Sequence, residues 1–327
     1  MNKVINWGII APGRIARKFA SDLKLVENAN LLAIASRDID KAREFAKEFG
    51  ADRFYGSYEE LVHDPDVDVV YVASPHVFHF EHSLLCLENG KHVLCEKPMG
   101  MNARQVMELA RVADQRNLFL MEAFWTNFIP SFVKFRELVA NGVIGDIKVI
   151  QADFGFKANY DINARTFNKE LGGGSLLDIG LYPVFLALEL AGEPDQIKAS
   201  AIIGSTGVDE TCSMIFNYPE KGIVANLSSS FLVSTPTEAL IYGTLGTIKM
   251  HAQWHAPTRI SIFKDGKEDV LKFDEPGFGY EHEIQEVVSC LLDGLTESKS
   301  FPLTKSILLH QALDRVRAEI GLRYKYD

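Results

Sequence analysis

Through the first 123 residues, short apolar runs alternate with segments whose apolar positions recur every three or four residues. The short runs are typical of buried strands, and the periodic segments are typical of helices that cover a sheet. A capping box at 57–60 and glycines at 50 and 90 mark expected helix ends. Strands are expected at 4–10, 30–36, 67–74, 91–95 and 118–123. This alternation predicts an α/β domain with a doubly wound parallel sheet of the Rossmann type.

Beyond residue 124 the pattern changes to closely spaced strand-like runs. Eight such runs lie between 147 and 273, separated by glycine, proline and aspartate turns. They predict a large, mostly antiparallel open sheet. Helices are expected at 130–141, 174–191, 280–294 and 303–320. We therefore expect two domains, a dinucleotide-binding domain at 1–123 and a second α/β domain at 124–327.

Composition and charge narrow the classes of function. The chain has 327 residues, of which 47% are hydrophobic, with a net charge of −10 and no basic run. Such a charge opposes binding to a phosphate backbone, so nucleic acid is not expected as a partner. No apolar run approaches the roughly 18 residues that span a bilayer, and the N-terminus has no signal-peptide pattern. Four cysteines without a CxxC pair are expected to be buried thiols, in a cytoplasmic protein.

The segment "GIIAPGRIA" at 8–16 follows the first strand and opens the first helix. A dinucleotide fingerprint belongs at this place, where small residues bring a pyrophosphate close to the backbone N–H groups of a helix N-terminus. The match is imperfect, because Ala11 stands at the first glycine position. We expect Ala11, Gly13, Arg14 and Ile15 to contact a dinucleotide, although a tight strand–helix turn would give the same letters.

The second strand ends in Ser36-Arg37, where an NAD site usually has an acidic residue that binds the ribose hydroxyls. A hydroxyl and a guanidinium suit a 2′-phosphate instead. We therefore predict NADP as the cofactor, with NAD as the alternative. The competing interpretation is a solvated arginine at a helix start, with Asp38 or Asp40 as the cap.

Lys97 stands between an apolar strand and Pro98, at the edge of the sheet where ligands bind in open α/β folds. Proline ends the ladder and holds the chain in a fixed turn, with a cis bond as one possibility. A lysine in this place can bind a substrate hydroxyl and stabilise the developing alkoxide. A strand-end lysine that reaches into water would look the same.

A second cluster of chemical residues lies in "LGGGSLLDIGLYP" at 171–183. Asp178 and Tyr182 are four residues apart, on one face of a helix. The phenol can take a hydroxyl proton, and the carboxylate can orient a hydroxyl. The alternatives are that Ser175 and Asp178 form a capping box and that Tyr182 lies in the core.

Three histidines follow the third strand, His76, His79 and His82. Their spacing of three residues and the lack of a nearby Cys or Asp argue against a metal, so no metal site is expected. His79 is expected to touch cofactor or substrate, and His82 to face water or the sheet. After the fifth strand, Trp125 and Phe128 suit either the wall of an apolar pocket or an interdomain core.

Together, "CEKPM", "SPHVFH", "EAFWTNFIP" and "LGGGSLLDIGLYP" resemble the Gfo/Idh/MocA family of NAD(P)-dependent oxidoreductases, in family order and over nearly the whole chain. The branch that this chain resembles most contains dimeric dihydrodiol dehydrogenases and NADP-dependent D-xylose dehydrogenases. The resemblance implies Lys97 and Tyr182 as catalytic residues, with Asp178 beside them. We also expect contacts with the cofactor from Ser74, His76, His79 and Glu96, of which the resemblance implies His79 and Glu96. Contacts with the substrate are expected from Trp125, Phe154 and Arg165.

Three positions depart from the family pattern: Ala11, His76 and Asn127, which stands where this branch usually has arginine. The departure at His76 puts the nicotinamide contact in question. The departure at Asn127 puts in question an anchoring contact for the substrate or for the domain interface.

The sequence predicts an NADP-dependent oxidoreductase that moves a hydride to or from a hydroxyl-bearing carbon of an aldose, cyclic polyol or trans-dihydrodiol. A glycoside-cleaving enzyme that retains its nucleotide and a non-catalytic NADPH-binding sensor are the alternatives. The open sheet needs a cover for its second face, and a homodimer supplies the simplest one.

Overall fold

The computed structural model describes residues 3–327, which divide into two compact units. The first unit contains the residues up to Gly100, Arg104–Phe128 and Glu275–Ile307, and the second contains Met101–Ala103, Ile129–Asp274 and Leu308–Asp327. The expected boundary at 123/124 differs from this division in three ways. Met101–Ala103 belong to the second unit, whereas the segment up to Phe128 and the returning segment Glu275–Ile307 belong to the first. The reason is packing: Phe124 stacks on Phe301 at 5.7 Å, and the Asn127 side chain donates to the Ser300 carbonyl at 3.4 Å.

The first unit is built on a six-stranded parallel sheet of order β3-β2-β1-β4-β5-β6. Its strands are β1 (Ile5–Ile10), β2 (Ala29–Ala35), β3 (Arg53–Tyr55), β4 (Val69–Val72), β5 (His92–Glu96) and β6 (Leu120–Ala123). The predicted doubly wound sheet is confirmed, and the sequence analysis missed only β3. This edge strand has three residues and no fully buried side chain, so it carries no periodic signal.

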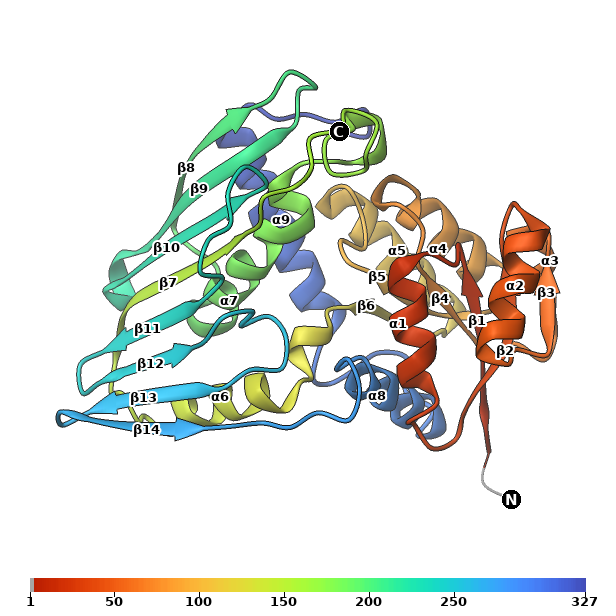
Figure 1. Cartoon of the computed structure of the whole chain (residues 1–327), viewed down its shortest axis with the longest axis horizontal. Helices are drawn as coiled ribbons and strands as arrows, with labels where there is room; N and C mark the ends of the chain where they lie inside the picture. The colour runs from red at the N-terminus through yellow and green to blue at the C-terminus, as the bar shows by residue number, and fades with distance from the viewer. Residues whose placement is uncertain (1–2) are drawn as a thin grey trace. The chain divides into compact units, whose positions relative to one another are not determined.

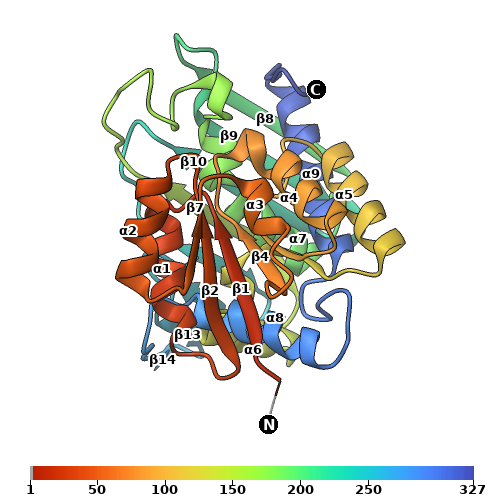
Figure 2. The ribbon, with the colours of Figure 1, turned by 90° about the vertical axis from the view of Figure 1, so that its right-hand side faces the viewer.

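Helices cover both faces of this sheet (Figure 2), with α1 and α2 on one side and α3, α4 and α5 on the other. They are α1 (Arg14–Leu23), α2 (Ile39–Phe49), α3 (Tyr58–Val62), α4 (His79–Glu88) and α5 (Ala103–Arg116), and α8 (Glu281–Leu292) packs beside α1. The 3-10 turns η1 (His76–Phe78) and η2 (Trp125–Asn127) follow β4 and β6. The predicted capping box is present at Ser57 and Glu60.

The second unit holds an eight-stranded sheet of order β14-β13-β12-β11-β7-β10-β9-β8 (Figure 1). Its strands are β7 (Ile147–Gly155), β8 (Gln196–Ile203), β9 (Asp209–Tyr218), β10 (Ile223–Ser230), β11 (Ala239–Gly243), β12 (Thr247–Met250), β13 (Ile260–Lys264) and β14 (Lys267–Leu271). All neighbours pair antiparallel except β7 and β10, which confirms the predicted mostly antiparallel sheet.

The helices of this unit are α6 (Pro130–Ala140), α7 (Leu181–Ala191) and most of α9 (Leu303–Glu319), with short turns η3 (Lys169–Leu171) and η5 (Pro219–Lys221). A single π turn, η4 (Leu176–Gly180), leads directly into α7, and both pack on β7 and β10. Side chains on this face of the sheet are buried, whereas alternate positions such as Ile202, Ile215 and Tyr242 remain exposed on the other face.

The segment from Lys169 to Ala191 is long and apolar enough to cross a membrane by length and composition, contrary to the expectation that no such segment exists. Its most apolar window is 94% buried inside the structure. The apolar character therefore reflects a core helix that is hydrophobic on all sides.

Candidate active site

The loop after β1 has the features of a dinucleotide site. Gly13 precedes α1 in an extended conformation, and no side chain caps the helix. The first-turn N–H groups, including that of Ile15, are therefore available to a pyrophosphate. A side chain added at Gly13 would meet its nearest atom only at 3.9 Å, so the space in front of the helix is open.

Ala11 adopts the left-handed conformation, with φ of +60°. Glycine is favoured there because a Cβ is strained in this region. Ala11 therefore keeps the backbone conformation expected of a glycine at this position, although alanine is less suited to it.

The end of β2 separates the roles of three adjacent residues. Asp38 caps α2 by accepting from the backbone N–H groups of Asp40 and Lys41, at 3.1 and 3.3 Å. Ser36 is buried, and its hydroxyl accepts from the Asp38 N–H at 3.2 Å. The Arg37 side chain is exposed next to the Tyr58 phenol, whose pKa is raised by burial and partly lowered again by Arg37. Arg37 is thus not required as part of the cap and lies where a 2′-phosphate binds in NADP sites.

The turn after β5 holds Lys97 through the carboxylate of Glu96. The Tyr71 hydroxyl donates to one Glu96 oxygen, and the Lys97 N–H donates to the other at 3.2 Å. The Lys97–Pro98 peptide is cis. Lys97 is partly buried, whereas the four preceding residues of β5 are buried. The lysine therefore directly follows the end of a buried strand.

His79 supports this turn from behind. Its two ring nitrogens lie 2.6 Å from the Ser74 carbonyl and 2.7 Å from the Pro98 carbonyl, and the side chain is fully buried. Burial lowers the pKa of His79 to about 4. His79 thus links two backbone segments, and its contact with cofactor or substrate stays a prediction. Both ring nitrogens are occupied by these carbonyls, which leaves neither as a metal ligand.

His82, expected to face water or the sheet, hydrogen-bonds the Ser74 hydroxyl at 2.9 Å. Its ring packs edge-on against Tyr58 at 4.7 Å and stacks on Phe78 at 5.6 Å. His76 is buried, with its ring centroid 5.7 Å from that of His79. Ser74, His82 and Tyr58 therefore connect the ends of β4 and β2.

Aromatic residues gather after β6 in the first unit. Trp125 is partly exposed and stacks on Tyr280 with centroids 4.7 Å apart and an interplanar angle of 4°. Phe128 packs on Phe301 at 6.4 Å. Asn127, at the position of the family's arginine, is fully buried and holds the Ser300 carbonyl, so it anchors the returning segment. Neither Tyr280 nor this anchor was identified from the sequence.

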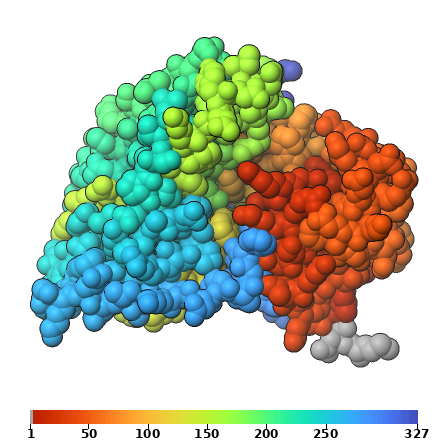
Figure 3. Space-filling model, in the orientation of Figure 1, coloured from red at the N-terminus to blue at the C-terminus, as the bar shows by residue number. Residues whose placement is uncertain are grey.

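In the second unit, the structure brings Asp178 and Arg165 together. Asp178 lies in η4, and its carboxylate accepts from the Arg165 guanidinium at 2.9 Å. Arg165 belongs to the loop after β7, whose Tyr160 and Ile162 are more than half exposed. The yellow-green atoms of this part of the chain lie on the face shown in Figure 3. Tyr182 follows within the first turn of α7 and is 4% exposed.

Tyr182 lies in an aromatic wall. The Phe154 ring is 5.6 Å from that of Tyr182, and the His255 ring is 5.0 Å from it and stacked on Phe154 at 4.1 Å. Phe154 was expected near substrate, whereas His255 was not singled out, because the loop "AQWHAPTR" has no periodic or motif signal. The wall combines an ionisable phenol with flat apolar surface.

Asp209 is a further residue that the sequence analysis did not identify. It begins β9, is fully buried, and accepts from the Ser175 hydroxyl at 2.8 Å and from the Leu176 N–H at 2.7 Å. Burial raises the pKa of Asp209 to about 6. The proposed capping box at Ser175 and Asp178 is not formed, because Ser175 itself has helical backbone angles and its hydroxyl turns to Asp209.

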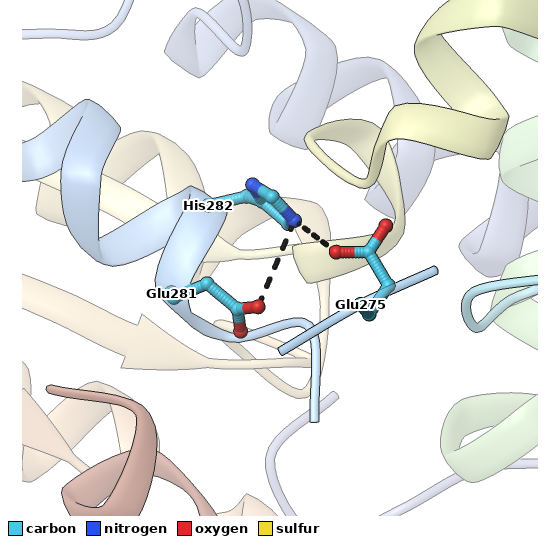
Figure 4. A group of neighbouring side chains, drawn as sticks. All are labelled: Glu275, Glu281 and His282. Atoms are coloured by element: carbon cyan, nitrogen blue, oxygen red, sulfur yellow. Dashed lines mark hydrogen bonds and ion pairs between the residues drawn. The ribbon is translucent and has the colours of Figure 1, made fainter. Parts of the chain in front are cut away.

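One group of described residues has the composition of a metal site, Glu275, Glu281 and His282 (Figure 4). The His282 ring nitrogen lies 2.7 Å from a Glu275 oxygen and 3.8 Å from Glu281, whose other oxygen accepts from the Gly279 N–H. These contacts close the loop before α8 onto the first turn of the helix. Acidic residues are favourable at this end of a helix without any metal.

Comparisons with known proteins agree with this geometry. A family model described as "Oxidoreductase family, NAD-binding Rossmann fold" matches residues 5–124, and the GFO/IDH/MocA C-terminal domain model matches 132–249. Trans-1,2-dihydrobenzene-1,2-diol dehydrogenase of Xenopus tropicalis is 42% identical over 97% of this chain and 98% of the relative. The Homo sapiens enzyme of the same name is 36% identical over 99% of each chain.

Solved structures are similar as well. A 3-ketoreductase from Actinomadura kijaniata in complex with NADP and TDP-benzene has a TM-score of 0.88 at 26% identity, covering 97% of this chain and 98% of its own. An aldose-aldose oxidoreductase from Caulobacter crescentus has a TM-score of 0.89 at 22% identity, with 98% of each chain covered, which shows the shared fold alone.

Proposed function

The chain belongs to the Gfo/Idh/MocA family of oxidoreductases and is an NAD(P)-dependent dehydrogenase acting on CH–OH groups, and within that activity we propose that it oxidises trans-dihydrodiols with NADP. The observation that carries the proposal is the wall of Tyr182, Phe154 and His255 next to the Arg165–Asp178 pair. Flat rings suit the face of a cyclic diol, and the charged pair suits its adjacent hydroxyls. An open-chain polyol offers no comparable flat face.

The proposed cofactor is NADP. Arg37 supports it, because an exposed guanidinium at the end of β2 binds a 2′-phosphate through charge-assisted hydrogen bonds. The uncapped start of α1 supports a pyrophosphate in front of Gly13. The nicotinamide supplies the hydride acceptor when it is bound.

The chain's own residues handle the proton and the developing charge. Tyr182 takes the proton of the hydroxyl that is oxidised, and Lys97 stabilises the alkoxide that forms. Asp178, fixed by Arg165, orients the neighbouring hydroxyl. Trp125, stacked on Tyr280, supplies further apolar surface for the ring of the substrate.

Three variants test these assignments. Lys97→Met and Tyr182→Phe should each lower kcat by about 100-fold or more while leaving NADPH affinity within about twofold. The double variant should be little worse than either single variant, because residues that act as a unit in one reaction are strongly non-additive. Tyr160→Phe is the matched control, since Tyr160 is an exposed loop tyrosine bonded to Ser205. Wild-type turnover in Lys97→Met, or fully additive losses, would contradict the assignment.

The proposal includes a homodimer through the exposed face of the eight-stranded sheet. Ile202, Ile215, Val224 and Tyr242 project from this face and are 37–56% exposed. A second copy would cover them in a symmetric, self-complementary contact. Light scattering after size exclusion should give twice the chain mass for the wild type and the monomer mass for Ile215→Lys, and a monomeric wild type would contradict it.

We also propose a cytoplasmic location for the protein. The four cysteines at 86, 95, 212 and 290 are free, buried thiols, which suits a reducing compartment. Fractionation of the source cells should place the protein in the soluble cytoplasmic fraction.

A further inference from the structure

The helix that carries Asp178 and Tyr182 has an unusual start. Ser175 has helical backbone angles of −70° and −35°, so it cannot act as an N-cap, which needs an extended conformation. The next five residues, Leu176–Gly180, form a π turn before α7 begins at Leu181. The first N–H groups of such a start need acceptors from elsewhere in the fold.

Asp209 supplies the acceptor from another strand. One carboxylate oxygen accepts both the Leu176 N–H, at 2.7 Å, and the Ser175 hydroxyl, at 2.8 Å. The Ser175 hydroxyl also lies 2.9 Å from the Ser229 hydroxyl on β10. The helix start is thereby fixed to two neighbouring strands of the sheet, and a carboxylate at this end is favoured by the helix dipole.

The turn that precedes the helix is fitted closely around this carboxylate. Gly174 has φ of +124°, and a Cβ there would lie 2.4 Å from the second Asp209 oxygen and 2.8 Å from the Tyr324 hydroxyl. Tyr324 in turn donates to the Gly173 carbonyl at 2.5 Å. At the other end of the π turn, a Cβ on Gly180 would lie 2.8 Å from the Ser229 hydroxyl. The glycines of this motif let Asp209, Ser229 and Tyr324 approach the backbone directly.

We propose that Asp209 is a positioning residue for the reaction, which sets the placement of Asp178 and Tyr182 by holding the backbone of Ser175 and Leu176. Asp209 does not touch substrate in this account, and the inference rests on the proposed roles of Asp178 and Tyr182. Displacing a reacting group by about 1 Å can lower a rate by about 100-fold. A fully buried carboxylate that holds the start of this helix therefore acts on kcat rather than on cofactor binding.

The test compares Asp209→Leu and Asp209→Asn with the wild type, using the full chain. Leucine keeps the branched shape of the side chain and removes the acceptor, so kcat per NADPH-binding site should fall by about tenfold or more, with NADPH Kd within about twofold. Asparagine keeps one acceptor oxygen without the charge, so kcat should fall by about threefold. Activity is expressed per NADPH-binding site, so a loss of folded protein alone would leave kcat unchanged.

The matched control is Thr211→Val, two residues further along β9. It removes the hydrogen bond between the Thr211 and Ser230 hydroxyls at 2.8 Å, without contacting the helix start. This variant should lose stability but keep the wild-type kcat. Where Asp209→Leu does not fold, Asp209→Asn decides the question, and a wild-type kcat in that variant would overturn the inference.

Tyr182→Phe, measured in parallel, separates this inference from the proposed function. If Tyr182→Phe is inactive and Asp209→Leu has the wild-type kcat, the inference alone is wrong. If Tyr182→Phe and Asp209→Leu both turn over like the wild type, the assignment of Tyr182 is wrong as well. If the wild type oxidises no diol, polyol or aldose, both are overturned.

Discussion

The carboxylate of Asp178 accepts a hydrogen bond from the guanidinium of Arg165 at 2.9 Å, although 13 residues separate them in the chain. Arg165 comes from a surface loop and Asp178 from the π turn of the core helix segment. The side chain of Asp178 is 9% exposed and that of Arg165 is 36% exposed. The pair thus connects a surface loop to the core helix segment, at the place where we expect substrate hydroxyls to bind.

Arg165→Met tests this pair. Removing the guanidinium leaves the Asp178 carboxylate without its charged partner, so KM for the diol should rise by about tenfold or more. NADPH affinity should remain unchanged, because the residues assigned to the cofactor lie elsewhere. Lys157→Met is the control, an exposed cation on the same loop. Equal KM values for the two variants would contradict the role of Arg165.

Arg37→Ala tests the choice of cofactor. Loss of a charge-assisted bond to the 2′-phosphate should weaken NADPH binding by about tenfold to 100-fold. NADH lacks this phosphate, so its affinity should not change. Arg43→Ala serves as the control, because Arg43 is an exposed arginine paired with Asp40 on α2. Fluorescence titration measures the affinity of each variant for NADPH and NADH. An equal loss of affinity for both nucleotides would contradict the assignment of Arg37 to the 2′-phosphate.

Ala11→Gly should stabilise the protein by about 1 kcal/mol. Ala11 has φ of +60°, where glycine avoids the strain of a Cβ. The same change at Ala110, in the middle of α5, should instead destabilise by about 1 kcal/mol, because glycine is a poor helix former. Urea unfolding of both variants measures these shifts, and a destabilised Ala11→Gly would show that the loop is not strained.

The buried carboxylate of Asp209 gives stability a defined pH dependence. Burial raises the pKa of Asp209 from 3.8 to about 6, so the folded protein holds this proton more tightly than the unfolded chain does. Stability should therefore fall as the pH rises from about 4 to about 6, by up to about 3 kcal/mol from this group.

Asp209→Asn removes this contribution and isolates it. Burial also raises the pKa of Asp22 to about 6. The contribution of Asp22 to the pH dependence of stability is the same in both proteins, so it cancels in the comparison. The unfolding free energy of Asp209→Asn relative to wild type should therefore increase between pH 4.5 and pH 7. Parallel curves for the two proteins would mean that Asp209 does not titrate in this range.

Much of the fold could be predicted from the sequence, because the short apolar runs of strands differ clearly from the three-to-four-residue apolar spacing of helices. The first half alternates buried strands with amphipathic helices, and Gly50, at φ +82°, ends α2 where it was expected to. Strand β3 could not be found, since an edge strand of three partly exposed residues has no pattern. The return of 275–307 to the first unit could not be found either, because it depends on long-range contacts such as that between Asn127 and Ser300.

The candidate site divides along similar lines. Lys97, Asp178 and Tyr182 stand in short motifs, so the sequence alone could propose them as site residues. Asp209 and His255 stand in ordinary strand and loop sequence, and only the fold shows that they contact the helix segment that carries Asp178 and Tyr182. His79 also stands in a conspicuous motif, but only the fold shows that both of its ring nitrogens lie on backbone carbonyls.

The most direct test of the account is the initial rate of NADPH formation by the purified wild-type chain with trans-1,2-dihydrobenzene-1,2-diol. NAD should be compared in parallel, together with a panel of aldoses and inositols. We predict turnover of the diol with NADP, at a higher kcat/KM than with NAD or with any panel member. NADPH binding without oxidation of the diol or of any other compound in the panel would contradict the central claim.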